Sequence, residues 1–235
     1  MSGDPHAWAK ELSTLHDHAW HRLIRGVHDR HAPARHPTLA TVLAEGLPQA
    51  RTVVLRKADR TSARLEIHTN LFSPKVAELK ATPVAALHVW DSGSRLQIRL
   101  QAEVVIAHGD DVADAWTRVP ESSRTAYSRS AVPGSLIPQS LAYESTPDAS
   151  AFAVVHLHIS SMDLLHLGPQ HRRALFFFAT ATGWDIGLRL EPPRSRAVRW
   201  ASCCWPISSL CPGPLALAAD LATAHALHAL RLGLK

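Results

Sequence analysis

Cysteine is scarce in this sequence, and no long uninterrupted apolar run occurs in it. The only three cysteines are Cys203, Cys204 and Cys211. An odd number with two adjacent residues predicts neither a disulfide framework nor a redox pair, and it favours a reducing, cytoplasmic location. The first residues contain no apolar segment typical of a secretory signal. Charged residues and histidines interrupt the Ala/Leu-rich run at 215–234, so we predict no membrane span.

Positive charge is in slight excess but is not concentrated anywhere. The formal net charge is +5 and the pI is about 9.5, carried by scattered arginines. Without a basic run interleaved with aromatic residues, nucleic-acid binding is not predicted, and a small anionic ligand is favoured. Sixteen histidines raise the question of a metal site. His18 and His21 lie about one helical turn apart, but no cysteine partner or HExxH pattern accompanies them, so we predict no metal centre.

Hydrophobic periodicity divides the 235 residues into three regions. Residues 1–37 are expected to form a helix over 5–27, with Asp4 as its cap, and a linker, both packing on a β domain. Residues 38–192 alternate short apolar runs with turn formers, which is typical of antiparallel strands. We expect strands at 38–43, 50–55, 65–69, 84–90, 95–107, 152–159, 173–179 and 184–190, and a turn into another strand at 161–165. Residues 193–235 form an extension whose structure the pattern does not indicate.

Polar side chains stand at the ends of several expected strands and could converge at one rim of a small barrel. They are Arg51, Arg56, Thr69, Lys75 and Gln97. The guanidinium, ammonium, amide and hydroxyl groups of these side chains can donate hydrogen bonds to a flat, anionic ligand.

A short helix is expected at 74–80, with Ser73 as its cap and Pro74 at its first position. Free backbone N–H groups and the helix dipole favour an anion at such a start. This segment, which includes Lys75, is the best phosphate candidate in the sequence. The Ser/Pro-rich stretch at 119–147 is interpreted either as a functional lid or as a solvated linker.

The order of these motifs over residues 38–192 resembles that of the pyridoxine/pyridoxamine 5′-phosphate oxidase superfamily, the split-barrel flavoproteins that bind FMN. The resemblance implies a mainly β fold with flanking helices, namely a six-stranded antiparallel split β-barrel. It also implies a homodimer that shares its FMN sites between subunits.

The resemblance assigns specific residues to the cofactor. Arg51 is expected near the phosphate and ribityl chain, Lys75 at the phosphate, Arg56 toward the ring and substrate, and Gln97 on the flavin. The segment 123–127 with Pro133 and Gly134 resembles a loop that reaches the cofactor from the partner subunit. The full set of implied FMN contacts is Arg51, Val53, Val54, Arg56, His68, Thr69, Lys75, Gln97, Pro133, Gly134 and Arg173.

For the substrate, Arg118 and Ser122 match two of the family's phosphate-gripping groups, and His171 matches the late histidine. Asp114 and Pro169 stand where two other gripping groups are expected, so pyridoxine 5′-phosphate is not the expected substrate. The leading interpretation is an FMN-dependent oxidoreductase acting on an unknown small molecule. The alternatives are a split-barrel module that binds FMN or haem without turnover, and a deazaflavin-dependent reductase on the same barrel.

Overall fold

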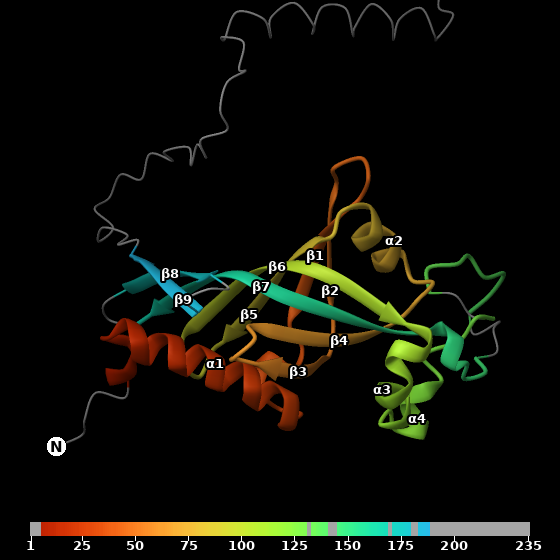
Figure 1. Ribbon diagram of the computed structural model, residues 1–235, viewed down its shortest axis with the longest axis horizontal. Coiled ribbons are helices and arrows are strands. Elements are labelled where there is room, and N and C mark those ends of the chain that lie inside the picture. The colour runs from red at the N-terminus through yellow and green to blue at the C-terminus, as the bar shows by residue number, and fades with distance from the viewer. Residues whose placement is uncertain (1–5, 131–132, 141–144, 169–170, 180–182, 189–235) are drawn as a thin grey trace, which may run out of the picture. The chain divides into compact units, whose positions relative to one another are not determined.

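The computed structural model describes residues 6–130, 133–140, 145–168, 171–179 and 183–188 (Figure 1). All of them belong to the first of the two units into which the chain divides, Met1–Pro193. The predicted C-terminal extension lies outside the described residues.

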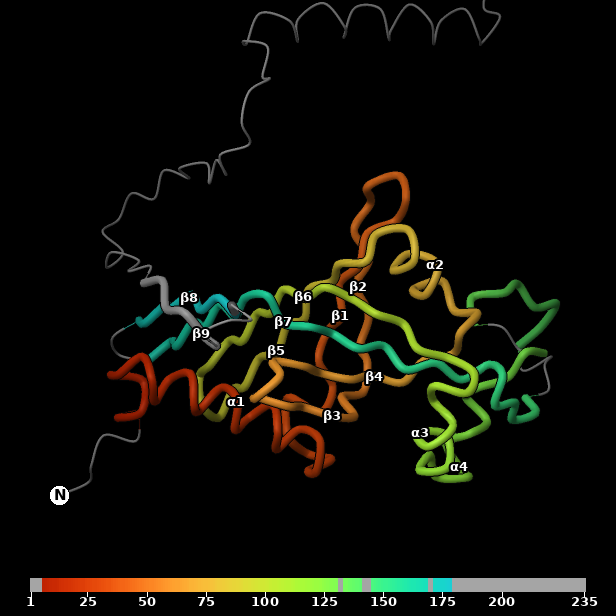
Figure 2. Tube along the Cα trace, viewed as in Figure 1, coloured from red at the N-terminus to blue at the C-terminus, as the bar shows by residue number. Residues whose placement is uncertain are grey.

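An antiparallel sheet dominates the described residues (Figures 1 and 2). Its main order is β2-β1-β5-β6-β7-β4-β3, and β8 and β9 continue from β7. The nine strands, three more than a six-stranded barrel contains, are β1 Thr38–Val42, β2 Pro48–Thr52, β3 Leu55–Asp59, β4 Arg64–Asn70, β5 Val84–Asp91, β6 Leu96–His108, β7 Phe152–Leu167, β8 His171–Ala179 and β9 Gly183–Leu188. The predicted mainly β, antiparallel split-barrel fold is confirmed, although the sheet does not close through hydrogen bonds.

The long strand β7 is where the sheet forks. One edge of β7 pairs with β6 along almost its whole length, while the other edge pairs first with β4 and then with β8. The sequence predicted a turn at 161–165, and this prediction is wrong. A register shift opposite Gln101 and Ala102 leaves Ser160 unpaired, so the chain bulges and continues as a strand instead of turning.

The two outer edges of the sheet are consecutive in the chain. The single strand predicted at 50–55 is interrupted at Val53 and Val54, which connect β2 on one edge to β3 on the other. The Val53 N–H group donates to the Pro37 carbonyl at 3.0 Å, which extends the β1–β2 pairing by one residue before the chain leaves for β3. This connection is therefore a seam between the two edges of the barrel, and we call Val53 and Val54 the seam residues.

The barrel core follows the period of two that strands impose. Along β5, burial alternates strictly, with Ala85, Leu87 and Val89 inside. Helix α1, Leu12–His28, adds the fully buried Leu23 and Trp20 to the same core. Burying each such side chain contributes roughly 1.5–3 kcal/mol, which holds α1 against the strands.

Helix α1 begins later than the sequence predicted. A separate 3-10 turn, η1 Ala7–Ala9, precedes it, and the Thr14 hydroxyl donates to the carbonyls of Trp8 and Glu11. These bonds occupy carbonyls of the connecting turn, so the two helical segments do not merge. The predicted cap, Asp4, lies outside the described residues.

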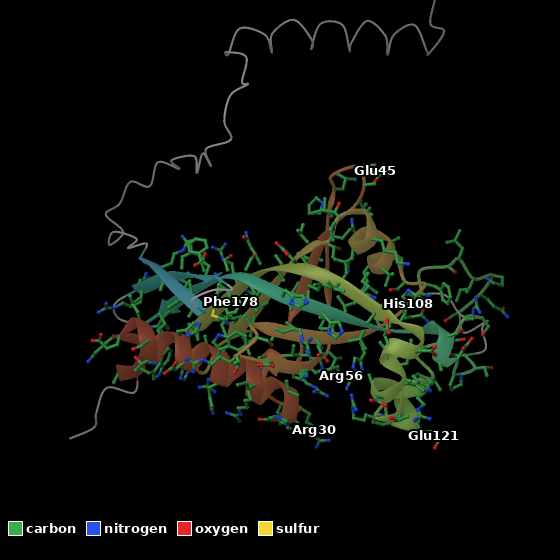
Figure 3. All side chains as sticks on the ribbon, viewed as in Figure 1. Arg30, Glu45, Arg56, His108, Glu121 and Phe178 are labelled. Atoms are coloured by element: carbon green, nitrogen blue, oxygen red, sulfur yellow. The ribbon has the colours of Figure 1, made fainter. Side chains whose placement is uncertain are left out.

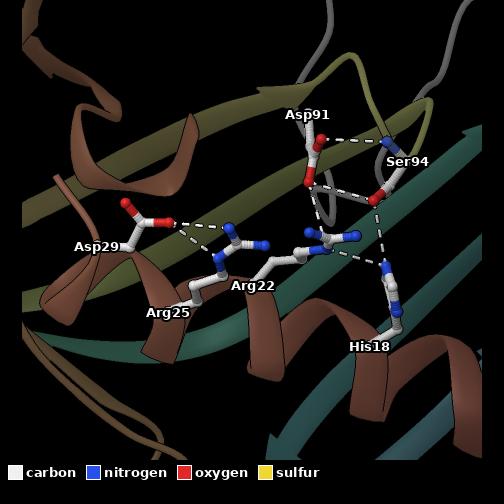
Figure 4. Close-up of polar contacts among 6 residues, drawn as sticks. All are labelled: His18, Arg22, Arg25, Asp29, Asp91 and Ser94. Carbon is white, nitrogen blue, oxygen red and sulfur yellow. Dashed lines mark hydrogen bonds and ion pairs between the residues drawn. The ribbon is translucent and has the colours of Figure 1, made fainter. Parts of the chain in front are cut away.

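A polar network fastens α1 to the turn between β5 and β6 (Figure 4). The Asp91 carboxylate accepts from the backbone N–H and the hydroxyl of Ser94, at 3.1 and 3.2 Å, and pairs with Arg22 at 3.3 Å. His18 Nε2 lies 3.3 Å from the Ser94 hydroxyl and accepts from Arg22 at 3.1 Å. Burial, followed by the charge of Arg22, lowers the pKa of His18 to about 4, which keeps this acceptor neutral at pH 7.

The remaining helices lie toward the other end of the barrel (Figure 1). Helix α2, Pro74–Ala81, has the start that the sequence predicted. The 3-10 turn η3, Gly109–Val112, leads into α3, Ala113–Thr117, and helix α4, Glu121–Arg124, comes next. The 3-10 turn η4, Ala149–Ala151, precedes β7. A second apolar cluster, formed by Val112, Val119, Tyr127, Phe152 and Val154, anchors this region to β7. In the described part of the chain, none of the helices is long and apolar enough to cross a membrane.

Candidate functional site

A pocket of about 450 Å³ opens at the seam. Its walls are the seam residues, the start of β3, the end of β4, the first turn of α2 and the chain around α4. This volume lies in the usual range of small-molecule sites. The lining residues are Thr52, Val53, Val54, Arg56, Ile67, His68, Thr69, Asn70, Lys75, Ser122, Ser123, Thr125, Ala126, Tyr127 and Pro133.

The α2 end of the pocket combines an ammonium group with two hydroxyl groups. Lys75 Nζ donates to Thr69 Oγ1 at 3.0 Å and to Ser73 Oγ at 3.2 Å, and the two hydroxyls lie 3.2 Å apart. Ser73 precedes α2 as predicted, but its side chain makes no capping bond to the helix and turns to Lys75 instead. The cation therefore sits beside the helix start, and the two together favour an anion.

The surroundings of Lys75 disfavour its charged form. Burial, and after it the positive charge of Arg51, lowers the lysine's pKa, which Glu78 partly offsets. An anionic ligand at this position would relieve both effects, because it supplies an opposite charge to a half-buried cation.

Arg51 does not line the pocket, although the resemblance placed it near the cofactor phosphate. Its guanidinium donates to the buried Glu78 carboxylate at 2.8 Å and to the Thr41 hydroxyl. Glu78 lies one turn into α2, so Arg51 acts on Lys75 through charge while its own donors are engaged by protein groups.

Arg56 and Tyr127 form the opposite wall. Arg56 lies in β3 (Figure 3). Burial raises the pKa of the Tyr127 phenol, and the charge of Arg56 opposes that rise. The Nε atom of Arg56 is buried and has no hydrogen-bond partner among the described residues. A buried donor of a charged group without a partner is costly, and a ligand acceptor in the pocket would remove that cost.

His68 lies between these two ends and is neutral. Burial, and after it the charge of Arg56, lowers its pKa to about 4. Its ring meets Phe152 edge-on at 5.0 Å. It can offer one donor and one acceptor to a ligand at pH 7, but no charge.

The segment around α4 was expected to reach the cofactor of a partner subunit, and here it lines the pocket of its own chain. Ser122 and Pro133 are wall residues. Gly134 has a φ of 89°, and a Cβ atom on it would come within 3.1 Å of Pro74 at the start of α2. Arg118 is exposed and does not line the pocket, but its charge contributes to lowering the pKa of His68.

Three expected site residues lie far along the sheet from this pocket. Gln97 pairs with Leu165 on β7, whereas Thr69 pairs with Ala153, twelve residues earlier on the same strand. At about 3.3 Å per residue, this is roughly 40 Å of strand. Arg173 lies beside Leu165, and His171 is exposed at the start of β8. The structure thus divides the expected residues between two places.

At the distant place, Arg173 is already paired. Its guanidinium donates to both carboxylate oxygens of Asp163, at 3.0 and 2.8 Å, and Arg99 joins the same carboxylate. Burial opposes ionisation of Asp163, but the hydrogen bonds from Arg173 and Arg99 outweigh it and lower its pKa. Asp163 therefore orients both arginines on this face of the sheet.

The pocket also contains residues that the sequence did not single out. Asn70 follows Thr69 in β4, and its side chain bonds the Ser128 carbonyl at 2.8 Å and the Phe72 N–H at 2.9 Å. Its position directly after the predicted strand was an available signal. Tyr127 belongs to the segment 123–127 that was expected to reach the cofactor, but it was not named as a contact itself; its ring packs against Trp116 and Phe152. Among the described residues, no group of histidine, cysteine and acidic side chains could hold a metal ion.

The chain is similar to known proteins of one family. Residues 17–108 match the family model described as pyridoxamine 5′-phosphate oxidase, FMN-binding domain. A pyridoxine/pyridoxamine 5′-phosphate oxidase of Arabidopsis thaliana is 28% identical over 181 residues, covering 70% of this chain and 90% of that protein. One from Chromohalobacter salexigens is 42% identical over 79 residues, covering 34% of this chain and 35% of its own.

Two solved structures share the fold. A pyridoxamine 5′-phosphate oxidase-related, FMN-binding protein from Nostoc punctiforme superposes with a TM-score of 0.61 at 22% identity, covering 75% of this chain and 96% of that chain. PhzG from Burkholderia lata, in complex with tetrahydrophenazine-1-carboxylic acid, gives 0.57 at 17% identity, covering 81% of this chain and 95% of its own.

Proposed function

We propose that this chain, which belongs to the pyridoxamine 5′-phosphate oxidase-like, FMN-binding split-barrel family, is an FMN-dependent oxidoreductase that acts on a small substrate. The observation that carries the proposal is the pocket at the seam, where Lys75 and two hydroxyls meet the start of α2 at one end and Arg56 presents an unpartnered donor at the other.

The residues present fit FMN. A phosphate group would take the place beside Lys75, Thr69 and Ser73, where an ammonium, two hydroxyls and the helix start all favour a dianion. The positive charge of Arg51 would also favour a phosphate beside Lys75, while Arg51 keeps its bond to Glu78. Gly134 keeps the loop close to Pro74 and so helps to cover this end.

The ring end of the site has a different chemistry. The backbone at the seam belongs to the edges of the sheet, so Val53 and Val54 can offer peptide groups to a planar heterocycle. His68 supplies a neutral polar group, and Arg56 supplies a cation. When bound, FMN provides the electron transfer, and the protein's part is to orient it, exclude water and set the local charge.

A homodimer would explain why the expected residues lie in two places. Gln97 and Arg173 are too far along the sheet to reach the pocket of their own chain, so a second copy would have to present them. They lie on an outer sheet face with exposed apolar side chains, of which Trp90 is 44% and Phe177 48% exposed. Burying such side chains between two copies would contribute to dimer stability.

For a substrate, the wall residue Ser122 and the exposed Arg118, whose charge acts on His68, would be the groups of this chain, and His171 would come with Gln97 from the second copy. Arg56 and Arg118 favour an anionic substrate.

Anaerobic reduction tests the oxidoreductase assignment. FMN-loaded protein is mixed with NADH, NADPH or small amines, and the visible absorbance of the oxidised flavin is followed before and after oxygen is admitted. We expect bleaching by at least one donor, faster than for free FMN, and recovery with oxygen or an acceptor. Bound flavin that no donor reduces faster than free FMN would favour the non-catalytic cofactor-binding module.

A further inference from the structure

Glu78 lies one turn after Lys75 in α2 and does not line the pocket, and the resemblance assigns it no role. We propose that Glu78 is a positioning residue, whose carboxylate holds the Arg51 guanidinium away from the pocket and so limits how strongly the site prefers a phosphorylated ligand. The inference rests on the proposed function, because it concerns the same pocket, and it adds a residue that decides how much the ligand's phosphate contributes to affinity.

Three side chains from separate elements bond one another around Glu78. Arg51 in β2 donates from Nη2 to Glu78 Oε2 at 2.8 Å and from Nη1 to the Thr41 hydroxyl. The Thr41 hydroxyl donates to the same Oε2 atom. Register explains the meeting, because Arg51 pairs with Leu39, and Thr41 is two residues further along β1 on the same face. Each member of this network therefore bonds the other two.

The network is shielded from water. Thr41 is 2% and Glu78 6% exposed, and the side chain of Arg51 is 23% exposed. Salt and solvent screen a pair in such a place much less than a pair on the surface. If Arg51 turned to the pocket, the Glu78 carboxylate would stay buried without its counter-charge, which is strongly unfavourable. Glu78 therefore keeps the guanidinium where it lies.

Both charges of the network nevertheless act on the phosphate end of the pocket. Thr52 and Val53, the residues that follow Arg51, line the pocket, whereas Arg51 itself does not. After burial, which lowers the pKa of Lys75 most, Arg51 lowers it further and Glu78 raises it. A phosphate beside Lys75 would feel the same two charges with opposite signs, attracted by Arg51 and repelled by Glu78.

The charge of Glu78 thus weakens the attraction for a phosphate in two ways. It offsets the charge of Arg51, and it engages a guanidinium that could otherwise bond two phosphate oxygens at once. Without this carboxylate, Lys75 and Arg51 would face the phosphate as two cations. A ligand without a phosphate would gain nothing from the change, so the preference for the phosphorylated ligand should rise.

Binding of FMN is compared with that of riboflavin, which lacks the phosphate, by quenching of flavin fluorescence. Glu78→Gln keeps the size of the side chain and removes its charge, and Glu78→Met fills the same space without a polar group. The double variant Arg51→Gln/Glu78→Gln removes both charges. Glu11→Gln controls for net charge, because Glu11 is exposed at the start of α1 and its side chain makes no capping bond.

We expect FMN affinity to rise about three- to thirtyfold in both Glu78 variants, because a charge that repels the dianion is removed, while riboflavin affinity and the Glu11→Gln protein stay unchanged. The double variant should lose this gain, because the gain acts through Arg51. An FMN-to-riboflavin ratio that does not rise, or a gain that persists without Arg51, would overturn the proposal. Loss of riboflavin binding in both Glu78 variants would also overturn it, because Glu78 would then support the fold of the pocket.

Calorimetric titration with inorganic phosphate separates this inference from the proposed function. If the wild type takes up no FMN but Glu78→Gln binds phosphate more tightly than the wild type does, the cofactor is refuted and the role of Glu78 stands. If FMN binds and the Glu78 variants leave its affinity unchanged, the role of Glu78 is refuted and the cofactor stands. Protein that binds neither FMN nor phosphate overturns both.

Discussion

Replacing Lys75 by glutamine should separate recognition of the phosphate from recognition of the ring. The substitution removes the charge that Thr69 and Ser73 orient and keeps a polar chain of similar reach. A hydrogen bond to a charged group contributes about 1.5–3 kcal/mol, so we expect FMN affinity to fall by roughly tenfold to a hundredfold. Riboflavin, which has no phosphate, should bind Lys75→Gln about as well as it binds the wild type.

The assay is quenching of flavin fluorescence, with both ligands titrated into wild-type, Lys75→Gln and Lys80→Gln proteins. Lys80 is exposed in the last turn of the same helix, so its variant controls for net charge and helix content. Equal losses for FMN and riboflavin would mean that Lys75 supports the fold of the pocket. Unchanged FMN affinity would place the phosphate elsewhere and refute the reasoning.

Three further predictions concern the shared site and the stability of the barrel. Gln97→Ala should weaken flavin binding, and mixed dimers with Lys75→Gln chains should regain one normal site, as measured by flavin stoichiometry; no regain contradicts sharing. Because burial lowers the pKa of His16 to about 4 and its Nε2 accepts from Trp20 at 3.1 Å, the stability it contributes above pH 6.5 should be lost as the pH falls toward 4. Because His18 and His68 titrate over the same range, the measured quantity is the difference: by pH 5 the wild type should lose about 1–2 kcal/mol more stability to urea than His16→Gln, which keeps the acceptor. Asp91→Ala should cost roughly 1–3 kcal/mol in the same assay, because it leaves Ser94 and Arg22 without their shared partner, whereas an unchanged unfolding midpoint would show that this network does not fasten α1.

The sequence predicted the α2 end of the site well because its chemistry is local. Thr69, Ser73 and Lys75 lie within seven residues, and a strand end followed by a helix start brings them together whatever the rest of the chain does. The antiparallel strands were predictable for the same reason, since alternation along a strand such as β5 records which face is buried.

The rest of the site depends on contacts between distant residues. The strand predicted at 50–55 is interrupted at Val53 and Val54 because β2 and β3 lie at opposite edges of one sheet. Local β propensity contains no information about which edge a strand occupies. Glu78, 27 residues from Arg51, decides where that arginine points. The path of β7 separates Gln97 from the pocket, and the bulge at Ser160 carries the strand through an apparent turn. Each of these features depends on tertiary contacts, so the spacing of residues in the sequence could not predict it.

The most direct test of the account is the absorbance spectrum of the purified protein, followed by release of any chromophore and its identification by chromatography. The account predicts a flavin spectrum and FMN released at about one per chain, because we propose one phosphate-binding end per chain, at Lys75. Protein that is colourless and takes up no added FMN, or that releases a different cofactor, would contradict it.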